Sequence, residues 1–179
     1  MNWQKVNWSI IVIGILFTFT AASSSYFFWQ QYVVTKPLTQ AIQGIDGVEQ
    51  VTLDTQEKNQ GIREVHVTLT NVSNLQTTYQ LINDTIETNL GEKRFKLVLH
   101  DHRTPQLEQL LYSIHYYIYE GIFTGNFGTM SETIQKKASA ADTQAQLYMD
   151  TNYVYLQLTT TTGNLYQVFP RQLDSKEVK

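Results

Sequence analysis

Cysteine is missing from all 179 residues of the chain. Its absence excludes disulfide bonds, thiolate metal sites and cysteine nucleophiles together. A domain outside the cytoplasm can fold without disulfides, and a cytosolic domain has no need of them. The missing cysteine therefore limits the chemistry of the protein but leaves its location open.

Charge is also scarce. Charged residues make up 16 % of the chain, well below the quarter or so that is usual in globular proteins. The formal net charge is −3, so the sequence offers no electrostatic case for binding nucleic acid. Part of the shortage of charge lies in one long segment near the start of the chain.

Sequence motifs of several enzyme classes are lacking. The chain has no GxSxG hydrolase elbow, no Ser-x-x-Lys pattern, no HExxH metal motif and no GxGxxG loop. The glycine-containing segment 121–128, "GIFTGNFG", lacks the lysine and the preceding strand that a phosphate-binding loop needs. We therefore predict a protein without catalytic residues, cofactor or metal.

The long uncharged segment predicts a membrane anchor. Residues 7–34, "NWSIIVIGILFTFTAASSSYFFWQQYVV", contain no charged side chain and are long enough to cross a bilayer as a helix. Aromatic residues lie at both ends of the segment, as they do at membrane interfaces. The alternative is a cleaved signal peptide, because "TAASSS" supplies small residues. The apolar run continues past these small residues, which favours a retained anchor.

The orientation follows from a few charges. Lys5 precedes the segment, whereas Asp46, Glu49 and Asp54 follow it. The positive-inside rule then places residues 1–6 in the cytoplasm and everything from residue 36 outside the cell membrane.

The outer part of the chain begins with an α-β-β-α-β pattern, predicted as one subdomain at residues 36–101. In "REVHVTLT", Val65, Val67 and Leu69 alternate with polar residues, as in a strand that is half buried. "SNLQTTYQLINDTIETNLG" has the periodicity of an amphipathic helix, and Ser73 with Gln76 predicts a capping box at its start. The polar "QEKNQG" predicts a hairpin loop.

A second subdomain, residues 102–171, is predicted as two helices followed by a three-stranded antiparallel meander, with a flexible tail at 172–179. Thr104 and Pro105 suit the start of a helix, and Gly125 with Asn126 suits a break before the next helix. The overall fold class is α+β after an N-terminal transmembrane helix.

The first of these two helices is aromatic on most of its sides. Tyr112, His115, Tyr116 and Tyr119 lie beside the apolar stripe that contains Ile114 and Ile118. Such a helix is usually buried between two layers, so we expect it to be the central helix between the first sheet and the meander. The alternative is that the tyrosine side is an interaction or pocket face, because tyrosine is enriched in interfaces.

A polar cluster precedes the same helix. His100 and His102 flank Asp101, and with His115 they supply three imidazoles that could in principle hold zinc. No motif with the spacing of zinc ligands, such as HExxH, accompanies them. We expect Asp101 to pair with Arg103, or to accept N–H groups of the following helix.

The segments "PLTQAIQGIDGVEQVTLD", "REVHVTLT", "LQTTYQLINDTIETNL" and "FKLVLHD" resemble the ring-building-motif domains of bacterial secretion and sporulation membrane proteins. Gly47 and Val48 occupy the matching positions of the I-x-G-V-x-x-V pattern before a strand. The resemblance implies two helices packed on one three-stranded sheet and assembly into membrane-bound rings. It covers about a third of the chain, and the whole chain looks like a small anchored envelope protein of a Gram-positive bacterium.

Together these observations predict a non-catalytic, single-pass membrane protein. Its extracytoplasmic domain would act as a scaffold or accessory subunit of a cell-envelope assembly, with a protein partner or a second copy as its contact. A sensor of small ligands or cell-wall fragments, with a cleft between the halves lined by Tyr112, Tyr116 and Tyr119, is the first alternative. An envelope hydrolase that uses His100, His102 or His115 is the second.

Overall fold

The computed structural model describes residues 12–20, 36–54, 63–90 and 95–172. Residues 12–20 are helical. The labelled elements follow in the order α2 (Lys36–Gln43), β1 (Val48–Leu53), β2 (Arg63–Leu69), α3 (Leu75–Leu90), β3 (Phe95–His100), α4 (Pro105–Thr124), α5 (Phe127–Ser139), β4 (Gln144–Met149), β5 (Tyr153–Thr159) and β6 (Asn164–Pro170). The mixed α+β class predicted from the sequence is confirmed.

The first half contains a three-stranded sheet in the order β1-β2-β3. β1 and β2 are antiparallel, whereas β2 and β3 are parallel and are connected through α3. Val65, Val67 and Leu69 of β2 are fully buried. They pack in one cluster with Leu38 of α2 and Ile82 of α3, so both helices cover the same face of this sheet.

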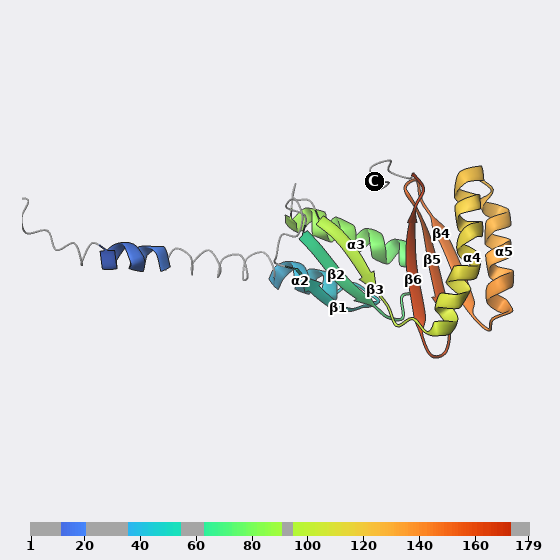
Figure 1. Ribbon diagram of the computed structural model, residues 1–179, viewed down its shortest axis with the longest axis horizontal. Helices are drawn as coiled ribbons and strands as arrows, with labels where there is room; N and C mark the ends of the chain where they lie inside the picture. Colours follow the sequence, from blue (N-terminus) through green and yellow to red (C-terminus); the bar gives the residue numbers. More distant parts are fainter. Residues whose placement is uncertain (1–11, 21–35, 55–62, 91–94, 173–179) are drawn as a thin grey trace, which may run out of the picture.

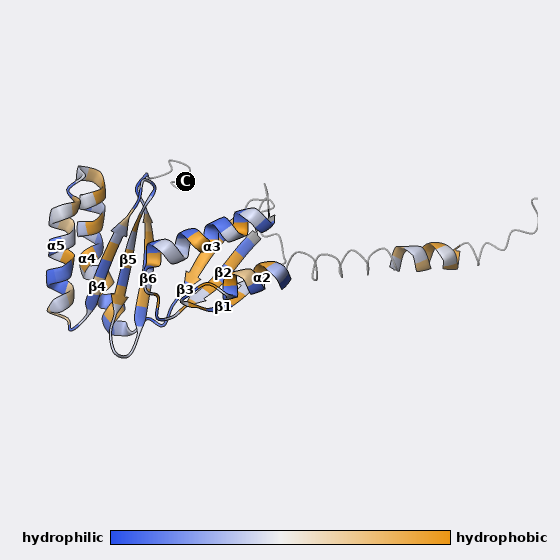
Figure 2. Cartoon of the chain, turned by 180° about the vertical axis from the view of Figure 1, so that it is seen from behind, coloured by the Kyte–Doolittle hydropathy of each residue, from blue (hydrophilic) through white to orange (hydrophobic). Residues whose placement is uncertain are grey.

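The second half contains an antiparallel sheet in the order β4-β5-β6. Helices α4 and α5 pack against each other and cover the face of this sheet that lies away from the first half (Figure 1). Ile114 and Ile118 of α4 and Ile134 of α5 are fully buried against Val154 and Leu156 of β5. Figure 2 shows hydrophobic segments, coloured orange, along the strands of both sheets.

Strand β5 is buried on both faces and joins the two halves. Val154 and Leu156 face the helices α4 and α5, whereas Tyr155 belongs to the cluster of the first half. On the same side, the Val72 N–H donates to the Tyr166 hydroxyl (3.1 Å), and the Gln157 amide donates to the Val72 carbonyl (2.6 Å). The two predicted subdomains therefore share a core.

The predicted position of the aromatic helix is wrong. α4 lies on the outer side of the second sheet (Figure 1). α3 packs on the first sheet through its buried isoleucines and contacts β4 and β5 of the second sheet. Tyrosines of the second sheet supply the apolar surface that covers α3, since Tyr79 of α3 makes edge contacts with the rings of Tyr153 and Tyr155. α4 therefore has one buried side and one exposed side.

Most of the predicted helix ends are confirmed. Thr104 caps α4 and Pro105 follows it; Gly125 ends the helix with φ 72°, and Asn126 caps α5. The predicted capping box of α3 is wrong, because the side chain of Asn74 accepts the free N–H of the first turn. The Ser73 hydroxyl donates to Asp46 instead.

The predicted membrane span at residues 7–34 falls mostly outside the described residues. Within the part of the chain that the structure describes, no helix is long and apolar enough to cross a bilayer. The predicted loop "QEKNQG" and the tail from residue 173 also lie outside the described residues.

Candidate interaction surface on helix α4

Helix α4 exposes a line of large aromatic side chains. Tyr112 is 70 % exposed, Tyr116 is 65 % exposed and Phe123 is 69 % exposed. At 100° per residue these positions lie within about 40° of one another around the helix and extend over about 16 Å. We call Tyr112, Tyr116 and Phe123 the aromatic stripe. Large apolar side chains exposed together on one side of a helix are typical of an interaction site.

The histidine beside the stripe is held in one orientation. His115 Nδ1 lies 2.7 Å from the carbonyl oxygen of Tyr112, so Nδ1 carries a proton and donates it. In the neutral ring, Nε2 is then a hydrogen-bond acceptor. The ring centroid of His115 lies 3.9 Å from that of Tyr116 and 5.5 Å from that of Tyr112. Tyr112, His115 and Tyr116, three residues of the predicted interaction face, thus pack into one aromatic surface.

A groove of about 450 Å³ runs beside this surface, between α4 and β6. Tyr119 and Phe169 of β6, which both line it, contact each other edge to face with a centroid distance of 5.9 Å. Its lining residues are Arg103, Glu108, Leu111, Tyr112, His115, Tyr119, Gln167 and Phe169. The cleft was predicted between the two halves, whereas this groove lies within the second half. Tyr112 and Tyr119 line it, and Tyr116 lies outside it on the aromatic stripe.

The β6 contribution to the groove was not predicted. The predicted meander already places "NLYQVFP" at an edge of the sheet, as the order β4-β5-β6 confirms, but nothing in the sequence places this edge beside α4. Phe123 was also missed. Its spacing from Tyr112 and Tyr116 is the signal that would have found it.

One end of the groove carries a fixed ion pair. Arg103 donates from Nε and Nη2 to the two oxygens of the Asp101 carboxylate, at 2.8 and 2.9 Å, which confirms the predicted pair. The hydrogen bond with Asp101 raises the pKa of Arg103, and burial opposes the rise. Asp101 also accepts the N–H of Tyr166 in β6 at 2.9 Å, rather than N–H groups of α4. This pair therefore fastens the linker before α4 to the second sheet.

The remaining members of the polar cluster lie apart. His100 stacks on His66 of the neighbouring strand, with 3.0 Å between His66 Nδ1 and His100 Nε2. His102 Nε2 contacts the Glu49 carboxylate at 2.6 Å, and His115 belongs to the surface of α4. No group of three potential metal ligands exists among the described residues.

A polar joint connects α3 to the second sheet. The Asp150 carboxylate accepts hydrogen bonds from the Tyr155 hydroxyl (2.6 Å), the Gln80 amide (3.0 Å) and the N–H groups of Asn152 and Tyr153. Burial alone would raise the pKa of Asp150, but these hydrogen bonds outweigh it and lower the pKa. Burial raises the pKa of Tyr79 in the same joint to about 12, and the neighbouring Tyr153 adds to the rise. This joint is structural, because its polar groups satisfy one another.

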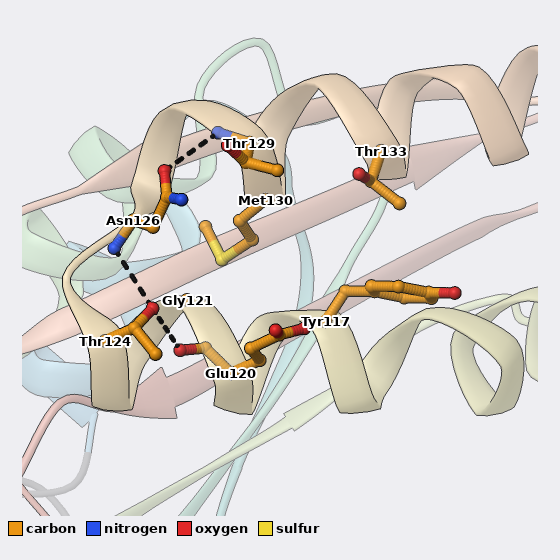
Figure 3. A pocket seen from close by; sticks show the side chains of 8 residues that line it. All are labelled: Tyr117, Glu120, Gly121, Thr124, Asn126, Thr129, Met130 and Thr133. Atoms are coloured by element: carbon orange, nitrogen blue, oxygen red, sulfur yellow. Dashed lines mark hydrogen bonds between the residues drawn. The ribbon is translucent and has the colours of Figure 1, made fainter.

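A smaller cavity of about 150 Å³ lies between α4 and α5 where the chain turns (Figure 3). Met130 of α5 points toward Gly121 of α4 there. A Cβ at Gly121 would lie 2.6 Å from the Met130 sulfur, so glycine permits the close approach of the helices. We assign this cavity to helix packing.

Searches against protein-family models, curated proteins and solved structures found no match to the chain. The resemblance to ring-building-motif domains therefore stays a prediction. The fold and the surface together define an α+β domain with an exposed aromatic stripe next to a groove at a sheet edge.

Proposed function

We propose that this protein is a single-pass membrane protein whose extracytoplasmic domain acts as a scaffold or accessory subunit of a cell-envelope assembly. The aromatic stripe on α4 carries the proposal. Three aromatic side chains that are about two-thirds exposed stand on one side of one helix, and exposed aromatic groups of this kind are enriched at protein contacts.

The position of the stripe favours a protein partner over the bilayer. α2 begins at Lys36, directly after the predicted anchor at residues 7–34. α2 lies at one end of the domain, and α4 with α5 lies at the other end (Figure 1). A chain anchored through residues 7–34 would thus present α4 away from the membrane surface, where other envelope proteins are within reach.

The topology can be tested with one cysteine, because the chain has none of its own. Ser139 is exposed at the end of α5. We expect Ser139→Cys to react with a membrane-impermeant maleimide in intact cells, and the labelled chain to sediment with the membranes. Protection of this cysteine until the cells are lysed would contradict the orientation, and recovery of a soluble, trimmed chain would contradict the anchor.

The contact can be tested with a photoreactive amino acid in the native membrane. A benzoylphenylalanine at Tyr112 places the reactive ketone on the stripe, and the same group at exposed Gln135 on α5 is the matched control. We expect a discrete cross-linked product from position 112 alone, which mass spectrometry would identify, and a lower yield when Tyr116→Ala is combined with it. Equal yields from both positions would refute the proposal.

A sensor function is the second candidate, and the groove favours it. A volume of about 450 Å³ is within the range of small-ligand sites. Its walls combine aromatic rings with the polar groups of His115, Gln167 and Glu108. Binding of a soluble cell-wall fragment by the purified chain, lost on Tyr119→Ala, would favour this function over the scaffold.

A further inference from the structure

Strand β6 is an edge of the second sheet, and its main-chain groups alternate in direction. The Arg171 N–H donates to Asn152 beside β5 (2.8 Å), whereas the Asn164 N–H donates away from the sheet to the His102 carbonyl (3.1 Å). The Tyr166 N–H also points away from β5, toward Asp101. By the same alternation, the N–H and C=O groups of Val168 point away from β5.

The outward groups of Val168 are open. Within the described ranges of the chain, neither the N–H nor the C=O of Val168 has a hydrogen-bond partner outside the ladder with β5. The linker that contains Asp101 and His102 covers only the first half of β6. Pro170 follows at the other end, and it has no N–H to offer.

These open groups lie along the groove. Gln167 and Phe169, the two β6 residues that line the groove, are the direct neighbours of Val168. Their side chains face α4, while the Val168 main chain faces sideways from the sheet. The groove therefore offers apolar side-chain contacts, and the adjoining edge of β6 offers an unpaired donor and acceptor. This combination matches an extended polypeptide, which binds by adding a strand to a sheet edge.

We propose that the groove between α4 and β6 binds an extended peptide segment of the partner protein as an added strand that hydrogen-bonds to Val168. This inference rests on the proposed function and names the form of the partner. The segment inserts alternate apolar side chains toward Leu111, Tyr119 and Phe169, because successive side chains of a strand point to opposite faces. A strand between the linker and Pro170 can be only a few residues long.

Charge at one end of the groove adds a second requirement. Asp101 and Arg103 compensate each other there, and Glu108 lines the same groove with its field acting on Arg103. The net charge of the Asp101, Arg103 and Glu108 side chains is −1 at neutral pH. We expect a lysine or arginine in the peptide at this end.

Other occupants fit these features less well. A bilayer offers no donor or acceptor in its hydrocarbon region for the Val168 main chain. A second copy would pair two edges that both contain Pro170, and proline interrupts such a ladder. The aromatic stripe exposes on the order of 450 Å², from about two-thirds of three large rings, whereas a stable interface buries about 800 Å² on each partner. A peptide in the adjoining groove extends the contact toward that area.

The test uses the full chain in lipid nanodiscs and a phage-displayed library of random linear decapeptides as the probe. The best peptide is then synthesised with a fluorescein label. We expect alternate apolar residues and one basic residue in the selected peptides. Val168→Pro removes the N–H and should weaken binding about tenfold, as expected for a lost hydrogen bond plus a steric clash. Val168→Ala is the matched control, since it loses the same side-chain packing and keeps the N–H, and should stay within about threefold.

A second measurement needs no variant that could misfold. Hydrogen exchange of the Val168 amide in the unmodified chain should slow about tenfold or more when the peptide saturates the groove. N-methylation of the peptide at the residue opposite Val168 should abolish this protection.

The proposal is overturned if no peptide is enriched, if Val168→Pro binds the peptide as well as Val168→Ala, or if the Val168 amide exchanges unchanged. Self-association of the chain that disappears with Val168→Pro would also overturn it and assign the edge to a second copy. Native cross-linking at Tyr112 that persists in Val168→Pro would defeat this inference and leave the proposed function. Peptide binding without any native cross-link at Tyr112 would contradict the proposed function and leave the peptide-binding inference standing.

Discussion

Truncation of a side chain should cost more stability on the buried side of α4 than on its exposed side. Ile118 is fully buried between α4 and the second sheet. Replacing a buried isoleucine with alanine removes its transfer free energy and leaves a cavity, so the free energy of unfolding should fall by about 2–5 kcal/mol. A domain of this size has only about 5–15 kcal/mol of stability in total.

Tyr116 gives a smaller expected loss. With 65 % of the side chain exposed, Tyr116→Ala removes roughly 70 Å² of buried area, which corresponds to about 1.7 kcal/mol as an upper bound. Alanine favours the helix by about 0.5 kcal/mol over tyrosine. The expected net loss is therefore about 1 kcal/mol.

Thermal unfolding of the purified chain, monitored by far-UV circular dichroism, distinguishes the stability losses of Ile118→Ala and Tyr116→Ala. At about 2–4 °C per kcal/mol for this chain length, Ile118→Ala should lower the Tm by at least about 4 °C, and by at least about twice as much as Tyr116→Ala does. Leu81→Ala, on an exposed position of α3, provides a control for truncation at the surface. Equal losses of Tm for Ile118→Ala and Tyr116→Ala would refute the assignment of Tyr116 to an exposed stripe.

Further predictions concern the joint at Asp150 and the glycines of the helical pair. Asp150→Asn should lower the free energy of unfolding by about 1–3 kcal/mol at neutral pH. Because the pKa of Asp150 is lowered in the folded chain, its contribution is present above the ordinary pKa and is lost as the pH falls through the folded pKa. Urea denaturation should therefore show the two chains converging in acid, and a constant difference would contradict the pKa argument. Gly121→Ala should destabilise the chain by up to about 2 kcal/mol, since the clash with Met130 exceeds the gain in helix propensity. Gly128→Ala, with no atom within 4 Å of the added Cβ, should stabilise it by up to about 1 kcal/mol; stabilisation by both would show that Met130 moves aside.

Local signals in the sequence were sufficient for most elements and for several caps. The alternation around Val65 and Val67 gave β2, and the Thr104-Pro105 pair marked the start of α4, because these features depend on residues a few positions apart. The prediction of the α3 cap was wrong, although it too depends on residues a few positions apart. Ser73 and Asn74 are adjacent and both suit a cap, and only the contact of Ser73 with Asp46 decides between them.

The position of α4 could not be derived in this way. Its many aromatic residues suggested burial on all sides, but β5 supplies a surface that buries α3 instead. Tyr155 and Gln157 alternate with Val154, Leu156 and Leu158, a pattern typical of a strand with one side in solvent, whereas they are 1 % and 5 % exposed. Pairing between segments that are distant in the chain decides which face of a strand is covered, and hydrophobic periodicity contains no information about that pairing. The groove depends on the same long-range pairing, so only its α4 wall was predictable.

The contacts of Val72 constrain how the protein acquires its structure during synthesis. Val72 follows β2 directly, yet its N–H and C=O find their partners in Tyr166 and Gln157, 94 and 85 residues further along the chain. When the first half emerges from the ribosome, the N–H and C=O of Val72 therefore still lack their partners. The tyrosines of the second sheet that complete its hydrophobic core are also missing. Closing such long loops slows folding. We expect neither half to become protease-resistant until β6 has been completed, after which both should do so in a single step.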